Sequence, residues 1–232
     1  MQLPIHREGW PIIAGFVLAT VLMWIFWPPL GIAGSVLSLW CIWFFRDPDR
    51  VPQDGTGAVL APADGRVLPL VEALPPEELE MDPEPLTRIS IFMNVFNVHV
   101  NRVPADGRIV RTHYRPGRFF NASFDKASAH NERLSALMML EGGERLAFVQ
   151  IAGLVARRIR STLEDGQIVR RGARFGIIRF GSRVDVYLPP EAKACVTEGQ
   201  HVIAGETVIA EFPGRNMPDG ADATRDDGGS KG

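Results

Sequence analysis

The chain has 232 residues, and its 25 Lys and Arg nearly balance its 27 Asp and Glu, giving a formal charge of −2. With 46% hydrophobic and 22% charged residues, it is excluded from the disordered, collagen-like and basic nucleic-acid-binding classes. Two cysteines, Cys41 and Cys195, are too few for a disulfide framework or a cysteine-based metal site. We therefore expect two free thiols, no bound metal and no nucleic-acid partner.

The N-terminal part of the chain carries no charged side chain from Gly9 to Phe45 and holds all five tryptophans. Its apolar segments 10–27 and 30–45 each approach the roughly 20 residues that a spanning helix needs. Pro28-Pro29 breaks the helix between them because proline has no backbone N–H to donate. We predict that residues 1–46 form a helical hairpin that spans the bilayer twice or enters one leaflet and returns. A secretory signal peptide and a hairpin buried in the soluble domain are the alternatives.

Charges at the two ends of this hairpin predict its orientation. Arg7 precedes the apolar region, whereas Arg46 and Arg50 follow it. Positive side chains near membrane segments favour the cytoplasmic side. We therefore expect a cell-membrane protein whose following domain faces the cytoplasm.

From about residue 47 the sequence changes to short runs rich in Val, Ile and Phe, separated by Gly, Pro and Asp. This spacing predicts a mostly β (α+β) domain over residues 47–213, an antiparallel sandwich or barrel with few helices. Helices are expected at 124–140 and 153–163, an acidic loop at 72–85, and a disordered tail at 214–232. The apolar runs that predict strands are 57–71, 86–104, 107–114, 145–153 and 182–189.

Segment 192–212 has the short glycine turns of a lipoyl-like sandwich. A carrier domain would bear a modified lysine at a hairpin tip, but Lys193 lies outside the expected turn. We therefore interpret this segment as hairpin packing.

The dipeptide Gly181-Ser182 lies between two β-like runs. Such pairs are usually turns. In a strained turn, however, the serine hydroxyl can attack the preceding carbonyl and shift the acyl group from nitrogen to oxygen. Elimination from the resulting ester would cut the chain and leave a pyruvoyl group on Ser182.

Gly181-Ser182 can thus be interpreted as a simple turn or as a self-cleavage site. Several motifs, taken together, favour the second interpretation. In chain order they are FFRDPDR (44–50), APADGRV (61–67), FNVHVNRVPADG (96–107), PGRFFNASFDKASAHNER (116–133), GARFGII (172–178) and FGSRVDVYLP (180–189). With them the chain resembles the phosphatidylserine decarboxylases, in particular their short bacterial and archaeal proenzymes.

The resemblance implies cleavage into a large β chain (1–181) and a small α chain (182–232) that stay associated. The pyruvoyl group from Ser182 would be the only cofactor. It would form a Schiff base with phosphatidylserine in the membrane, act as the electron sink for CO₂ loss, and release phosphatidylethanolamine.

The resemblance also implies roles for His99 in proton transfer and for Asp64 in orienting a histidine during self-cleavage. Longer relatives carry a second histidine where this chain has Arg102, so a relay of Asp64, His99 and Ser182 is not carried over directly. Arg102 and Arg118 are candidates to face the substrate, with a solvated surface position as the alternative. The other histidines, His113, His130 and His201, are interpreted as structural.

Two other functions stay open at this point. The first is a pyruvoyl-dependent decarboxylase of a soluble amino acid, and the second is a non-catalytic, membrane-anchored adaptor. The sequence leaves the oligomeric state undetermined.

Overall fold

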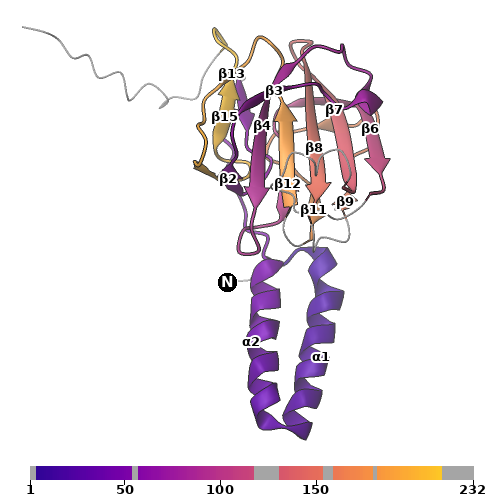
Figure 1. Ribbon diagram of the computed structural model, residues 1–232, viewed down its shortest axis with the longest axis vertical. Coiled ribbons are helices and arrows are strands. Elements are labelled where there is room, and N and C mark those ends of the chain that lie inside the picture. Colours follow the sequence, from indigo (N-terminus) through magenta and orange to yellow (C-terminus); the bar gives the residue numbers. More distant parts are fainter. Residues whose placement is uncertain (1–3, 54–56, 118–130, 154–158, 180–181, 216–232) are drawn as a thin grey trace, which may run out of the picture.

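The computed structural model describes residues 4–53, 57–117, 131–153, 159–179 and 182–215. Two antiparallel helices project from one end of a β domain, and strands β4, β12 and β8 run roughly along the direction of the helices (Figure 1). The helical elements are η1 (Arg7–Gly9), α1 (Trp10–Phe26), α2 (Pro28–Phe44) and η2 (Glu77–Leu79). The strands are β1 (Ala58–Leu60), β2 (Gly65–Val67), β3 (Val71–Ala73), β4 (Leu86–Met93), β5 (Val100–Arg102), β6 (Gly107–Arg115), β7 (Arg133–Leu140), β8 (Arg145–Ala152), β9 (Ile159–Ser161), β10 (Ile168–Val169), β11 (Arg174–Ile178), β12 (Ser182–Tyr187), β13 (Lys193–Ala194), β14 (His201–Val202) and β15 (Val208–Glu211).

The β domain is built on a nine-stranded sheet in the order β10-β6-β7-β8-β12-β4-β2-β14, with β3 also paired to β4. Two three-stranded sheets, β1-β15-β13 and β5-β11-β9, accompany it. The main hydrophobic core contains buried side chains from all three sheets, among them Ile91, Phe148, Phe175, Val184 and Ile209. The pairings between these strands are antiparallel, so the predicted mostly β, α+β class is confirmed.

Strand β12 is central to this sheet because it pairs along its whole length with β4 on one side and β8 on the other. All six of its residues are buried. A strand covered in this way makes its backbone hydrogen bonds within the sheet, with none directed to water. The start of β12 is therefore fixed by two neighbours at once.

The hairpin forms where the sequence predicts it. Trp27 is extended between the helices, and Pro28 and Pro29 occupy the first turn of α2, where a missing N–H costs nothing. The inner face of α2 carries small residues such as Gly31 and Gly34, and Ser38 Oγ lies 2.9 Å from Thr20 Oγ1 on α1. Close approach and interhelical polar contacts of this kind hold helices together in lipid.

The outer face of the hairpin is apolar. Phe26 is 83% exposed and Ile25 is 72% exposed, and Leu18, Ile32 and Leu39 are exposed on the same hairpin. Arg7–Phe26 is long and apolar enough to cross a membrane by length and composition, whereas Pro28–Phe44 is shorter. A surface that is apolar outside and small or polar inside matches an acyl-chain environment and indicates association with a membrane.

The base of the hairpin belongs to the same packing as the β domain. Phe44, Phe45 and Ile13 share a buried cluster with Val100 and Ile177 of strands β5 and β11. Apolar contacts therefore join the hairpin to the β domain across the predicted boundary at residue 46. That residues 1–46 and 47–213 are separate domains stays a prediction.

Both predicted helices of the β domain are wrong where the structure describes them. Residues 133–140 form strand β7, and residues 159–161 form strand β9. Segment 133–140 is rich in Leu, Met and Ala, which favour helices, but pairing with β6 and β8 prevails over that preference. Residues 124–130 and 154–158 of these predictions lie outside the described part, as does the tail from residue 216.

The acidic segment 72–85 contains more order than a loop. Strand β3 pairs with β4, and η2 buries Leu79 against Leu137 and Ala147. Segment 192–212 consists of short strands joined by turns, which agrees with its interpretation as hairpin packing.

The helix interface predicts a difference between two glycines. A Cβ at Gly34 would lie 2.9 Å from Thr20 Oγ1 and 3.2 Å from Met23 Sδ, whereas a Cβ at Gly15 would meet nothing within 4 Å. Gly34→Leu should lower the free energy of unfolding by about 1–3 kcal/mol relative to Gly15→Leu, since both gain the same helix propensity and only one overpacks. Thermal unfolding in detergent micelles measures this difference, and equal melting temperatures would contradict the interface.

Candidate functional site

Ser182 is the first residue of β12 and is completely buried. It pairs with Met93, the last residue of β4, and with Ala152, the last residue of β8. Among the described residues, its hydroxyl donates to the thioether of Met93, with Oγ 3.8 Å from Sδ, which is a weak hydrogen bond. Gly181 lies outside the described residues, so the peptide bond between the two residues is not described.

Two buried amides accompany Ser182. Asn101 Nδ2 lies 3.7 Å from Met93 Sδ and 3.5 Å from the carbonyl oxygen of Pro62, and Asn101 Oδ1 accepts from Gln150 Nε2 at 2.7 Å. The sequence prediction missed both residues. A signal was present for Gln150, the one amide in the apolar run 145–153, because a buried polar side chain needs a hydrogen-bond partner.

His99 lies directly before β5 and has no exposed surface. Its Nδ1 is 3.0 Å from the carbonyl oxygen of Asn97, and its ring centroid is 4.3 Å from that of Phe44 in α2. A carbonyl only accepts, so Nδ1 carries the proton and Nε2 keeps a lone pair. Within the described part of the chain Nε2 has no hydrogen-bond partner.

Burial lowers the pKa of His99 to about 4, since the charged imidazolium is poorly solvated there. The hydrogen bond to Asn97 opposes this shift, and the positive charge of Arg46 adds to it. The ring is therefore neutral near pH 7, with a buried nitrogen that can accept a proton.

Asp64 has other partners than His99. Its Oδ1 accepts from the backbone N–H of Ala204 at 2.8 Å, and its Oδ2 is 2.9 Å from Arg50 Nη2. Burial raises the pKa of this carboxyl, and the Ala204 hydrogen bond and the charge of Arg50 oppose the rise. Among the described residues no hydrogen bond joins Asp64, His99 and Ser182 to one another.

Arg102, at the position of a second histidine in longer relatives, holds the linker that follows the hairpin. Its Nη1 donates to Gly172 O and its Nη2 to Pro48 O, both at 2.8 Å, and Nη2 lies 3.5 Å from Asp47 Oδ1. Arg174 binds the same Asp47 carboxylate at 2.8 Å. Arg102 is buried. Neither alternative considered for it, a substrate contact or a solvated surface position, describes this packing. Arg118 and His130 lie outside the described residues.

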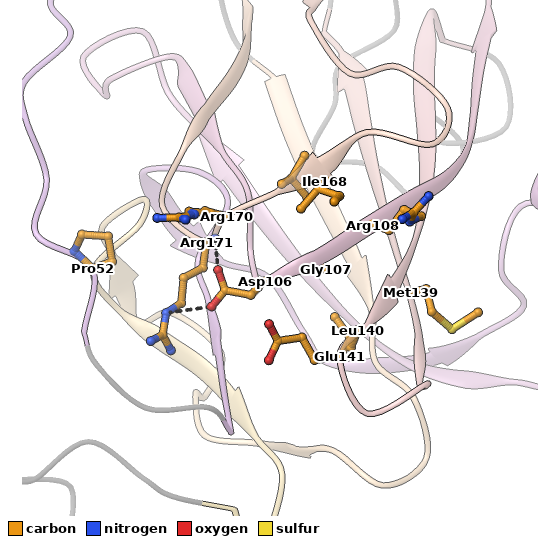
Figure 2. Close-up of a pocket in the computed structure, with 11 residues that line it drawn as sticks. Pro52, Asp106, Gly107, Arg108, Met139, Leu140, Glu141, Ile168, Arg170 and Arg171 are labelled. Carbon is orange, nitrogen blue, oxygen red and sulfur yellow. Dashed lines mark hydrogen bonds and ion pairs between the residues drawn. The ribbon is translucent and has the colours of Figure 1, made fainter.

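A cavity of about 840 Å³ lies elsewhere on the domain (Figure 2). Arg108 and Leu140 line it together with the ion pair between Asp106 and Arg171. Arg108 pairs with Met139 and Met139 pairs with Arg145, the first residue of β8, whereas Ser182 pairs with the last. The cavity is therefore at the opposite end of the strands from Ser182.

Comparison with known proteins identifies the family. The family model described as phosphatidylserine decarboxylase matches residues 37–210. A phosphatidylserine decarboxylase proenzyme of Paramagnetospirillum magneticum (strain ATCC 700264 / AMB-1) is 58% identical over 209 residues, covering 90% of this chain and 87% of the relative. Proteins of the same name from Rickettsia bellii (strain OSU 85-389) and Rickettsia akari (strain Hartford) are 55% and 54% identical, each over 208 residues and 90% of both chains.

The buried imidazole predicts a pH-dependent stability. A pKa of about 4 in the folded state lies below the ordinary value of 6.5, so protonation favours unfolding. The contribution of His99 is complete above pH 6.5 and should fall by about 3 kcal/mol as the pH drops from 6.5 to 4.

Denaturant unfolding in detergent at pH 7 and pH 4.5 measures this effect. Two proteins are compared, the Ser182→Ala variant and the Ser182→Ala/His99→Asn double variant. Both are expected to remain one chain, because self-cleavage needs the Ser182 hydroxyl. The difference cancels other titrating groups such as Asp64. Identical pH dependence in the two proteins would contradict a buried neutral His99.

Proposed function

Because the chain belongs to the phosphatidylserine decarboxylase family, we propose that it is a proenzyme that cleaves itself between Gly181 and Ser182 and then converts phosphatidylserine into phosphatidylethanolamine at the membrane. One observation carries this proposal beyond the family match. Ser182 is buried at one end of the sheet, where it pairs with Met93, the last residue of β4. Residues 94–97 continue from Met93 toward the base of the apolar hairpin, where Arg46 donates to Phe96 O.

The cleavage that we propose needs no oxidant or metal. Ser182 Oγ forms a bond to the Gly181 carbonyl carbon while the C–N bond breaks and the hydroxyl proton passes to the freed amine. Loss of the Ser182 Cα proton then expels the Gly181 carboxylate and leaves a dehydroalanine. Water hydrolyses this group to the pyruvoyl group and ammonia.

The surroundings of Ser182 fit a small keto-acyl group. Among the described residues, the hydroxyl makes one weak hydrogen bond, to Met93, and Asn101 supplies an amide donor next to the same sulfur. When present, the pyruvoyl carbonyl would bind the substrate amine and take up the electron pair released with CO₂.

His99 is the proposed acceptor of protons in this reaction sequence. Its Nε2 is buried, unpartnered among the described residues and neutral near pH 7, which suits a general base. We propose Asp64 as a positioning residue, because it fixes Arg50 and the Ala204 turn and does not contact His99.

The small chain would stay in place after cleavage. Strand β12 lies between β4 and β8, and β14 and β15 pair with β2 and β1. All of these neighbours belong to the large chain, so about a dozen residues bridge the two fragments through backbone hydrogen bonds. We propose that the hairpin holds this assembly at the cytoplasmic face of the cell membrane, as Arg7, Arg46 and Arg50 suggest.

Removal of the Ser182 hydroxyl tests the proposal directly. Ser182→Ala should remain one chain on a denaturing gel and release no CO₂ from phosphatidylserine vesicles, whereas the wild-type protein gives two fragments with a blocked small one. Ser90→Ala is a matched control, since Ser90 is a buried serine on the neighbouring strand β4. An uncut wild-type chain, or turnover by Ser182→Ala, would overturn the proposal. Faster turnover of free serine than of the lipid would instead favour a soluble amino acid as substrate.

Substitutions of the two side chains that we propose to assist self-cleavage, His99 and Asp64, should differ in their effect on its rate. His99→Asn should slow self-cleavage by roughly 10²- to 10⁴-fold, because it removes the base. Asp64→Asn retains an acceptor for Ala204 and should slow cleavage by roughly 10-fold at most. Time courses of fragment formation in newly synthesised protein measure both rates. Equal, large losses would show that Asp64 acts directly through His99.

A further inference from the structure

Arg46 is a cation at the base of the hairpin whose guanidinium is held by carbonyl groups. Its Nη1 donates to Trp43 O at 2.8 Å and its Nη2 to Phe96 O at 2.7 Å, while Cζ lies 4.2 Å from the Trp43 ring centroid. Within the described ranges no carboxylate forms an ion pair with it. Arg50, four residues later, is paired with Asp64. The guanidinium of Arg46 is thus held in one orientation by two carbonyl groups, and among the described residues no ion pair balances its positive charge.

The side chains beside Arg46 indicate where it lies relative to a membrane. Trp43 is 56% exposed and Phe96 is 64% exposed. The Phe96 loop is rigidly built, because Asn94 Oδ1 accepts from Phe96 N and Asn97 Oδ1 accepts from Asn94 N, both at 2.8 Å. An exposed indole and phenyl ring at the end of an apolar hairpin are typical of the headgroup level of a bilayer.

The same loop connects Arg46 with the site of Ser182. It follows Met93, whose sulfur contacts Ser182 Oγ, and it includes Asn97, whose carbonyl holds His99. Burial is the largest influence on the pKa of both side chains, lowering that of His99 and raising that of Asp64, and the charge of Arg46 acts on each in the lowering direction, so its field reaches both.

We propose that Arg46 binds the phosphodiester of the lipid substrate and so positions the headgroup at the entrance to the Ser182 site. This inference rests on the proposed function and adds a residue that selects the substrate. A guanidinium has five N–H donors, and among the described residues the Trp43 and Phe96 carbonyl groups engage one donor each on Nη1 and Nη2 of Arg46, which leaves donors suited to phosphate oxygens.

The headgroup of phosphatidylserine offers two anions, and the reaction favours the phosphate. Decarboxylation discharges the carboxylate, so a cation bound to it would stabilise the substrate more than the transition state. The phosphodiester keeps its charge throughout and lies nearest to the acyl chains, at the level of Trp43.

Steady-state kinetics with phosphatidylserine in micelles of a non-ionic detergent, which contributes no competing phosphate, tests the proposal. Arg46→Gln should raise KM by roughly 10- to 100-fold, the equivalent of one charge-assisted hydrogen bond, with kcat and self-cleavage close to wild type. Arg108→Gln is the control, since Arg108 is exposed at the opposite end of the sheet. A change in kcat alone, or an unchanged KM, would overturn the proposal.

Inhibition by the product separates this role from simple capping of α2. Phosphatidylethanolamine keeps the phosphate but has no carboxylate, so its inhibition constant should rise by the same factor as KM. An unchanged inhibition constant together with a raised KM would assign Arg46 to the carboxylate and refute the phosphodiester.

If Arg46→Gln is not cleaved, Arg46→Lys repeats the comparison with the charge retained and the planar fork removed, and unchanged constants for both lipids then overturn the proposal. Absence of lipid turnover in the wild-type protein would instead be a failure of the proposed function.

Discussion

The pairing of β12 along both of its edges is the constraint on which the rest of the site depends. It fixes the depth of Ser182 between Met93 and Ala152, and it surrounds the serine with neighbours that cannot move without breaking the sheet. The serine that we propose as the reacting residue therefore lies in a strand that is held on both edges.

The buried environment of His99 depends in turn on the hairpin. Phe44, at the end of α2, lies against the imidazole, and the residues on either side of His99, Val98 and Val100, belong to the cluster at the hairpin base. The membrane segment thus supplies part of the wall that keeps the ring neutral. An anchor that only tethered the domain would leave this histidine open to water and restore its ordinary pKa.

The sequence allowed prediction of those features that depend on local physics. Pro28-Pro29 places the turn between the two helices, the uncharged stretch marks the apolar hairpin, and the apolar runs indicate many of the strands. Segment 133–140 was predicted wrongly because its helix-forming residues are overruled by partners that lie far away in the chain. Contacts between residues far apart in the chain likewise could not be predicted from spacing. These are the ion pair of Asp64 with Arg50, the hydrogen bond from Arg102 to Pro48 O, and the hydrogen bond between Gln150 and Asn101 near Met93.

The hairpin is apolar on its outer face and small or polar on its inner face, and this has a consequence for how such a protein would find its substrate. If the exposed apolar side chains of the hairpin, Phe26 and Ile25 among them, are inserted in a bilayer, their transfer into water costs about 25 cal/mol for each Å² of apolar surface exposed. A chain retained in this way searches by lateral diffusion in two dimensions. Its rate then follows the mole fraction of substrate in the surrounding lipid, and dilution of the membranes in a larger volume leaves that rate unchanged.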